Sequence, residues 1–371
     1  MTQTPTYADL WGWYEEVRQS AIQTSNEPIL RAMDLHNEGW RNRERDPQHT
    51  LTLWNESKIL AQVAGNTWLA LYYGYWCCEA LTFYLDNIQD GLDEAVKLVV
   101  EANKPEYRHC PVLGRVYRMV IDAYSLTDVL GYEDNIRQML DFIESSIPVD
   151  VDTHSLLVAH HLVLATESGD LKGAYEWANK YLEVSEHSDF RKTTAHLTMC
   201  QLHHLREQYA PALAYAQTGE LAAQQSRRVA SRAVAFAWQA LLLHEMGKIE
   251  EAHLLFQRAT SVRAGLGTKP SGTYYDVLSK YHELRGEIEP ALHLRERAIA
   301  DVSGTGQLYG ECKARLLYTC LLGRLGRPID SALASVREAA QRLIAPHKFH
   351  PKIEMVERGI YEEKIIWGLV D

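Results

Sequence analysis

GKIEEAHLLFQRA, residues Gly247–Ala259, is the stretch that decides the fold, because its pattern recurs along the chain. Ala252 is the position that recurs most clearly, and we call each of its counterparts a marker. The seven markers are Ala95, Ile136, Ala174, Ala212, Ala252, Ala291 and Ala332, separated by 41, 38, 38, 40, 39 and 41 residues. Self-similarity at a period of roughly 20–50 residues is typical of stacked repeats, because one unit cannot bury its apolar face without its neighbours.

Each repeat is interpreted as a first helix, a short turn and a second helix that carries the marker. A glycine stands five or six residues before five of the markers, at Gly131, Gly169, Gly247, Gly286 and Gly326. Glycine adopts the left-handed conformation that closes a helix at little cost, so we expect the first helix to end there. Small residues such as Ala259 and Ala298 recur seven positions after several markers, which predicts close helix packing.

This pattern resembles the second half of a tetratricopeptide repeat, with Gly247, Ala252, Phe256 and Ala259 at the family's spacings. The resemblance covers about residues 65–345. The period exceeds the family's usual length of about 34 residues, and in this respect the chain is similar to long-helix variants found in bacterial regulators. The resemblance implies an all-α fold, a right-handed α-solenoid of about seven helical hairpins.

Two further segments flank the repeats. Residues 1–64 are expected to form three helices, because Asn26 and Asp46 each stand just ahead of a proline that suits a first helical turn. The three expected helices span about residues 6–22, 27–44 and 47–63. Residues 346–371 are expected to cap the far end with one amphipathic helix at 350–368, since a last repeat otherwise exposes its stacking face.

Charge is distributed unevenly along the chain, whose net charge is −11. Residues 1–190 carry 30 acidic and 14 basic residues, whereas residues 191–371 carry 19 and 24. The acidic half repels nucleic acid and anionic membranes, and the basic excess of the other half is too dilute for DNA binding. We therefore expect no nucleic-acid or membrane partner. The two halves could join copies into a homo-oligomer, or the split could only reflect solvated helix faces.

The cysteines and the apolar stretches indicate a cellular compartment. The six cysteines show no C-x-x-C spacing, and no charged-then-apolar signal segment opens the sequence. The longest apolar stretches are well short of the ~20 residues that a membrane helix requires. These features predict a cytoplasmic protein with reduced thiols.

The resemblance also implies where a partner binds. In tetratricopeptide solenoids the first helices of successive repeats line a concave groove, and the positions eight and eleven residues before the marker face it. The expected partner-binding residues at these positions are Gln201, His204, His244, Lys280 and Glu283. A polar surface that changes from repeat to repeat suits a peptide or protein partner.

Aromatic residues concentrate near the start of the chain, where six of the nine tryptophans fall within the first 76 residues. Trp68, Tyr72, Trp76 and Tyr84 belong to this group. One interpretation is that they pack the N-terminal helices onto the first repeat. The alternative is an exposed partner surface, to which Trp and Tyr contribute strongly.

The sequence contains no recognised catalytic motif. His196, Cys200 and His203 share one face of an expected helix, and His160 and His161 lie on the helix before it. Such N and S ligands suit zinc, but the small residue at Cys200 also fits close helix packing, so we expect no bound metal or cofactor. The favoured function is a non-enzymatic adaptor. A peptide-responsive regulator, similar in layout to bacterial response-regulator phosphatases, and a metal- or small-molecule-dependent enzyme are the alternatives.

Overall fold

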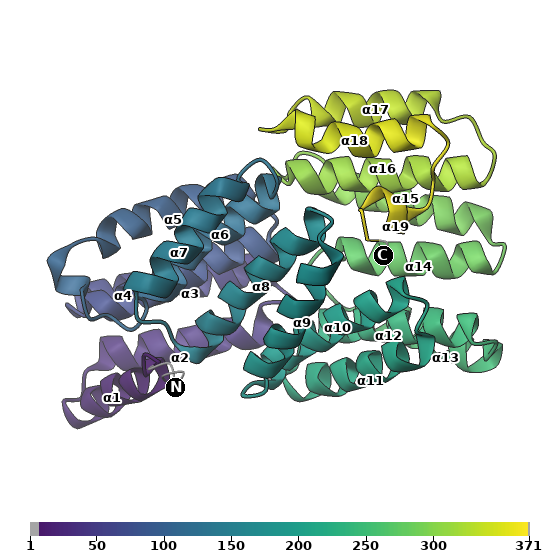
Figure 1. Cartoon of the computed structure of the whole chain (residues 1–371). Coiled ribbons are helices and arrows are strands. Elements are labelled where there is room, and N and C mark those ends of the chain that lie inside the picture. Colours follow the sequence, from purple (N-terminus) through teal and green to yellow (C-terminus); the bar gives the residue numbers. More distant parts are fainter. Residues whose placement is uncertain (1–6, 370–371) are drawn as a thin grey trace, which may run out of the picture. The chain divides into compact units, whose positions relative to one another are not determined.

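The computed structural model describes residues 7–369, and all regular structure within this range is helical. Helices adjacent in sequence pack as pairs (Figure 1). The all-helical prediction is confirmed. No helix in the described part combines the length and the apolarity needed to cross a membrane. The chain divides into two compact units: unit 1 runs to Ser125 and includes Asp134–Leu157, and unit 2 comprises Leu126–Glu133 and the chain from Val158 onward.

Unit 1 contains α1 to α5, most of α6, α7 and the start of α8. Its elements are α1 (Leu10–Gln23), α2 (Glu27–Asn42), α3 (Pro47–Val63), α4 (Thr67–Glu79), the π-helical turn η1 (Ala80–Tyr84), α5 (Ile88–Ala102), the 3-10 turn η2 (Pro105–Tyr107), α6 (Leu113–Asp128), α7 (Glu133–Ser146) and α8 (Val151–Glu167).

Unit 2 contains the rest of α8 and every later helix of the described chain. These are α9 (Leu171–Val184), α10 (Asp189–Leu205), α11 (Tyr209–Gln225), α12 (Val229–Glu245), α13 (Ile249–Arg263), α14 (Gly272–Leu284), α15 (Ile288–Val302), α16 (Leu308–Arg324), α17 (Asp330–Ala340), α18 (Pro346–Glu357) and α19 (Glu363–Ile366).

The second and third helices begin where the sequence predicts them, whereas α1 begins at Leu10, later than the expected start near residue 6. Asn26 Oδ1 accepts a hydrogen bond from the Ile29 backbone N–H at 3.3 Å, and Asp46 Oδ1 accepts one from the His49 N–H at 3.0 Å. A proline follows each capping residue in the first turn of α2 and of α3. Each cap satisfies a backbone donor that has no partner inside its helix, which fixes the start of the helix.

The markers are packing positions. Six of the seven have no exposed surface: Ala95, Ile136, Ala174, Ala212, Ala252 and Ala291. Ala332 is partly buried against the cluster formed by α15 and α16. The residues seven positions after the markers are all buried, including Ala259 and Gly219. Small side chains at these places let neighbouring helices approach closely.

Left-handed residues close most of the first helices. Gly169, Gly247 and Gly286 have φ values of 80°, 79° and 73°. Gly131 is an exception, because the side chain of Asp128 closes that turn by accepting from the Gly131 N–H at 2.9 Å. Glu207 stands five residues before Ala212, where other repeats have glycine, and its φ of 59° is unfavourable for a residue with a Cβ.

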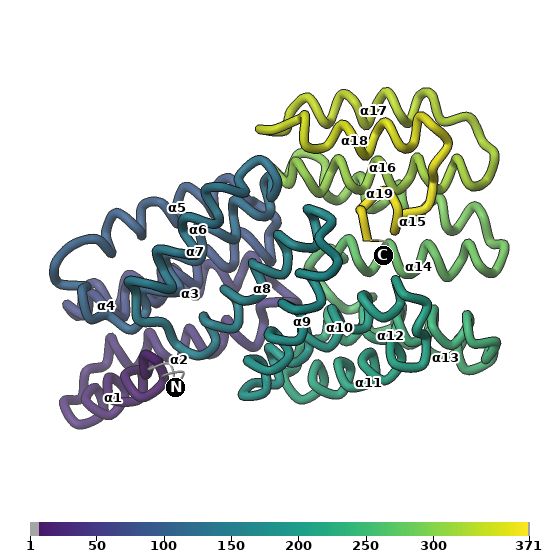
Figure 2. The backbone as a smooth tube through the Cα atoms, in the orientation of Figure 1, coloured from purple at the N-terminus to yellow at the C-terminus, as the bar shows by residue number. Residues whose placement is uncertain are grey.

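The prediction of a single helix at residues 350–368 is wrong. α18 ends at Glu357, and Gly359 takes a left-handed φ of 83° that reverses the chain. The following residues form only the short α19. Figure 2 traces this return from α18 to α19, where Glu363 meets Arg295 of α15, and the chain then passes Gly169 in the turn before α9. Residues 1–6 and 370–371 of the two expected terminal segments lie outside the described residues.

Candidate functional site

Four polar residues of unit 2 occupy the same place in four first helices. His204, His244, Glu283 and Arg324 lie in the last turns of α10, α12, α14 and α16. They stand eight residues before successive markers, so the repeat places them alike. We call them the first-helix row.

Neighbouring helices are linked through this row. His204 Nε2 lies 3.2 Å from Glu245 Oε2 of α12. Arg324 forms a two-pronged ion pair with Glu283, with both N–O distances at 2.8 Å. The ring of His244 meets that of Tyr281 edge-on at 5.6 Å. The row is therefore a strip in which His204, His244 and Glu283 each contact the next first helix, and Glu283 and Arg324 contact each other.

The five predicted partner-binding residues differ in exposure. Gln201 is exposed, and His244, Lys280 and Glu283 are half-buried. His204 is buried, with only 7% of its surface exposed, so the expectation that it faces a partner is wrong. The cause is Trp238 of α12, whose ring centroid lies 5.2 Å from that of His204.

The C-terminal segment of the chain lies against this strip. We call residues 361–369 the tail. Glu363 Oε1 lies 2.9 Å from Arg295 Nη2 and 3.6 Å from Arg324 Nη2. Arg324 also donates to the Tyr361 carbonyl oxygen at 2.9 Å. One carboxylate of the tail thus joins α15 and α16.

Cations surround the Glu363 carboxylate. Burial by itself raises the pKa of Glu363, but the charges of Arg295, Arg324, Lys280 and His204 outweigh it and hold the pKa below its ordinary value. Two of the predicted residues, Lys280 and His204, therefore act on the same carboxylate. Sequence reasoning missed Glu363 and Arg295 because the tail was expected to continue a helix.

The indole of Trp367 fills the other end of the contact. Lys313 Nζ and Lys352 Nζ lie 4.6 Å and 4.3 Å from the ring centroid, and Tyr309 and Phe349 flank the indole at 6.4 Å and 6.3 Å. Cations over the face of a Trp ring are attracted by its quadrupole. The pKa of Lys352 is lowered to about 8, mainly by burial; the charge of Glu167 opposes this shift and that of Lys313 adds to it.

A third contact joins the tail to the turn before α11. Lys364 Nζ lies 3.0 Å from Glu207 Oε1, the carboxylate carried by the left-handed residue. Next to this pair is a hollow of about 430 Å³, lined by Leu171, Leu205, Arg206, Glu207, Gln208, Lys364 and Leu369. We call the charged residues that contact the tail, together with Lys280, whose charge acts on Glu363, the tail cradle: Glu207, Lys280, Arg295, Lys313, Arg324 and Lys352. The tail cradle is equipped to hold a carboxylate and an aromatic ring.

The predicted aromatic surface is largely interior. Tyr72 and Trp76 are buried in unit 1, where their rings pack with those of Tyr14 and His36, so of the two interpretations they follow the packing one. Trp68 is half-buried and donates its Nε1–H to the Glu106 carbonyl at 3.0 Å. Tyr84, at the end of η1, is also half-buried.

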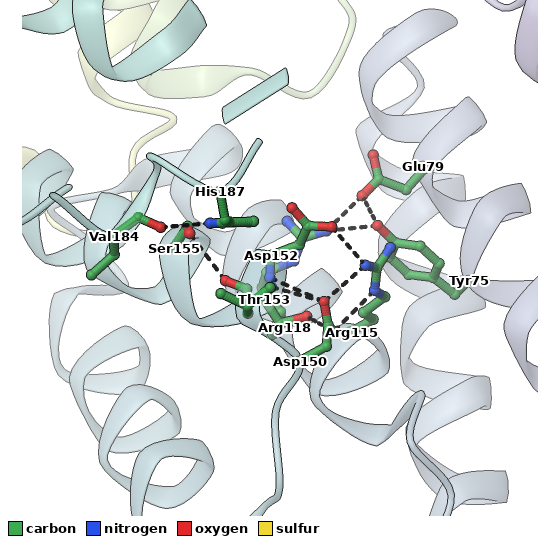
Figure 3. Close-up of polar contacts among 11 residues, drawn as sticks. Tyr75, Glu79, Arg115, Arg118, Asp150, Asp152, Thr153, Ser155, Val184 and His187 are labelled. Atoms are coloured by element: carbon green, nitrogen blue, oxygen red, sulfur yellow. Dashed lines mark hydrogen bonds and ion pairs between the residues drawn. The ribbon is translucent and has the colours of Figure 1, made fainter. Parts of the chain in front are cut away.

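Unit 1 contains a second polar cluster, built on two arginines of α6. Arg118 is 2% exposed and donates to Glu79, Asp122 and the Tyr75 hydroxyl. Burial and the Glu79 charge raise the pKa of Tyr75 well above its ordinary value. Figure 3 shows the Arg115 and Arg118 guanidinium groups directed toward the surrounding carboxylates.

Arg115 completes this cluster. Its Nη2 and Nε donate to the two carboxylate oxygens of Asp150 at 2.9 Å and 3.1 Å (Figure 3). Asp150 also caps α8, because it accepts from the Thr153 N–H and hydroxyl. The groups pair with each other away from water, which favours a structural role. Two arginines three residues apart in an apolar stretch were the signal in the sequence, since buried arginine is rare unless it is paired.

The histidines and the cysteine that were considered as zinc ligands do not form a metal site in the described structure. Within residues 7–369 no group of three His, Cys, Asp or Glu side chains is placed to hold a metal ion. Cys200 lies in the core of unit 2, where burial raises the pKa of its thiol, and His203 Nδ1 lies 2.6 Å from the side-chain oxygen of Gln208. A buried thiol with a raised pKa is a poor metal ligand, because the thiolate is the binding form.

Comparison with known proteins assigns the chain to no family. No protein-family model matches it, and no curated protein shows significant similarity to it.

Proposed function

We propose that the chain is a non-enzymatic scaffold that binds a protein or peptide along the first-helix row of unit 2. The observation that carries this proposal is the row itself. Polar residues at one structural position change from His244 to Glu283 to Arg324 on successive helices, and none of these three is buried. A strip of this kind presents a different side chain to each part of an extended partner, which gives specificity.

We also propose that the repeats belong to the tetratricopeptide type. Tetratricopeptide-like hairpins in a right-handed solenoid account for the buried markers and for the left-handed glycines before them. In that architecture each hairpin contacts its neighbours and the first helices supply the binding face. Buried small residues at the marker and seven positions later support this assignment.

Partner capture tests the proposal. The test variant replaces Gln201, His244, Lys280 and Glu283 by alanine, leaving buried His204 intact. The matched control replaces three exposed charged residues of the turn before α13 and of α13 itself, Lys248, Glu250 and Arg258. We expect one protein to be captured by the unaltered chain and by the control but not by the test variant, and to bind the purified chain directly. Equal capture by a test variant that keeps its helical circular dichroism would contradict the proposal.

The second candidate is a peptide-responsive regulator, and the docked tail favours it. A surface that already holds a segment of its own chain can respond to a competing segment, because the competitor only has to bind one of the two states better. Both candidates use the same surface.

A further inference from the structure

The tail is held by side chains. The backbone hydrogen bonds of residues 365–369 stay within the tail, from the N–H groups of Gly368 and Leu369 to the carbonyls of Ile365 and Lys364, for example. The described polar contacts between the tail and the rest of unit 2 run through arginine, lysine or glutamate side chains. A segment attached in this way does not share a backbone ladder with its support, so another segment with the same side chains can make the same contacts.

The tail also has little stability of its own. α19 is four residues long, and isolated helices shorter than about 12–15 residues are marginal in water. The left-handed Gly359 ends α18 before the tail begins, so α19 is not a continuation of that helix. Its helical turn therefore depends on the tail cradle.

The spacing of the two anchoring groups defines a ligand. Glu363 and Trp367 are four residues apart, so one helical turn places them on the same side of the segment. The carboxylate meets Arg295 and Arg324, and the indole lies under Lys313 and Lys352.

Charge complementarity limits the class of partner. Arg295 keeps Asp276, Arg324 keeps Glu283 and Lys313 keeps Glu167 as partners inside unit 2. Lys280 and Lys352 add two further cations. An acidic segment with an aromatic ring suits this environment.

Glu207 adds a further feature. It occupies a left-handed position where a glycine would be unstrained, and its carboxylate meets Lys364. A non-glycine residue at such a position costs about 1 kcal/mol or more. The contact with the tail gives a reason for this side chain.

We propose that the tail cradle is a binding site for peptide segments with a carboxylate four residues before an aromatic ring, and that the chain's own residues 361–369 occupy it until such a segment displaces them. This inference rests on the proposed scaffold function and names the chemistry of its partner. A helical segment of another protein with a Glu-x-x-x-Trp pattern is the simplest ligand.

A peptide probe tests the inference with the full chain. The probe is a fluorescein-labelled synthetic peptide with the sequence of residues 360–371, IYEEKIIWGLVD. The receptor is the E363Q/W367A variant, whose own tail lacks both anchoring groups. We expect this variant to bind the probe at least tenfold more tightly than the unaltered chain does, because a tethered tail competes at an effective concentration on the order of millimolar. A probe with the same two substitutions should not bind.

The matched control is Glu362→Gln, which changes the neighbouring carboxylate. Glu362 is exposed, so the E362Q chain should bind the probe as weakly as the unaltered chain. Equal probe binding by the folded E363Q/W367A variant and the unaltered chain overturns the inference, as does equal binding of the substituted probe.

A second measurement needs no variant. Adding excess unlabelled probe to the unaltered chain should increase hydrogen exchange in residues 361–369. Hydrogen exchange at the ends of the other helices should not change. Unchanged hydrogen exchange in the tail at a probe concentration that saturates the unaltered chain overturns displacement.

The two proposals fail in different ways. If the probe binds and the quadruple alanine variant still captures every partner, the tail cradle is supported and the scaffold function is contradicted. Loss of a partner from that variant without probe binding contradicts the tail cradle and leaves the scaffold function standing.

Discussion

Trp367→Ala should release the tail without unfolding unit 2. The indole is 7% exposed and has two aromatic neighbours and two cations within 6.4 Å of its centroid. Aromatic pairs contribute about 1 kcal/mol each beyond burial, and cation–π contacts about 0.5 kcal/mol or more each. We expect a loss of about 3 kcal/mol, at the lower end of the range for Trp→Ala in a core.

This loss should appear as a local change in hydrogen exchange. About 3 kcal/mol corresponds to roughly a 150-fold shift toward the undocked tail. The N–H groups of Gly368 and Leu369 are hydrogen-bonded only when α19 is formed, so their exchange, followed by mass spectrometry, should accelerate by a similar factor. The core helices α10 to α14 should keep their protection.

Trp177→Ala is the matched control. Trp177 is half-buried and stacks on His161 at 4.2 Å, so its loss should affect α8 and α9 and leave tail exchange unchanged. The reasoning is refuted if W367A leaves tail exchange as it is in the unaltered chain. It is also refuted if W367A accelerates exchange equally throughout unit 2, because the tail would then be part of the core.

Two further predictions concern ionised groups. Lys352 has a pKa lowered to about 8, mainly by burial, against an ordinary value of 10.5. Between these two pH values the unfolded chain binds more protons than the folded chain. The free energy of unfolding should therefore rise with pH, by up to about 3 kcal/mol. Urea unfolding of the unaltered chain and of Lys352→Met across pH 7–10.5 measures this, and identical slopes would contradict it. Arg118→Met should lower the free energy of unfolding by about 3–5 kcal/mol, because it leaves Glu79 and Asp122 without their guanidinium partner. Adding Glu79→Gln and Asp122→Asn should recover part of the loss, and an effect of Arg118→Met below about 1 kcal/mol in urea unfolding would show that the pairs are not needed.

Local signals made most helix positions predictable. Asn26 and Asp46 cap their helices with their own side chains, and Ala252 is buried because every repeat brings the same two helices together at that point. Such features depend on residues within one repeat. A single sequence therefore contains what is needed to place them.

Long-range contacts explain what the sequence did not reveal. Arg118 is buried because Glu79 lies opposite it, 39 residues earlier in the chain. His204 is buried because Trp238 of the next first helix covers it. A glycine such as Gly359 can lie inside a helix at a cost of about 1 kcal/mol, so the sequence pattern alone does not end the helix there. The chain reverses at Gly359 because Glu363 and Trp367 find partners on α15, α16 and α18. Periodicity contains no information about these encounters.

The ion pairs inside the tail cradle make displacement of the tail by another segment energetically feasible. A buried cation that loses its only counter-ion costs several kcal/mol, which would lock the tail in place. Here Arg295, Arg324 and Lys313 each retain a carboxylate of unit 2 at 2.9 Å or less when Glu363 leaves. What remains to be overcome is the contacts of the Glu363 carboxylate and the Trp367 indole, the Lys364–Glu207 pair and the burial of Ile366 and Leu369. A competing segment that makes the same contacts can supply this difference by binding the open tail cradle. The arrangement therefore combines a well-occupied resting state with a surface that stays intact when it is vacated.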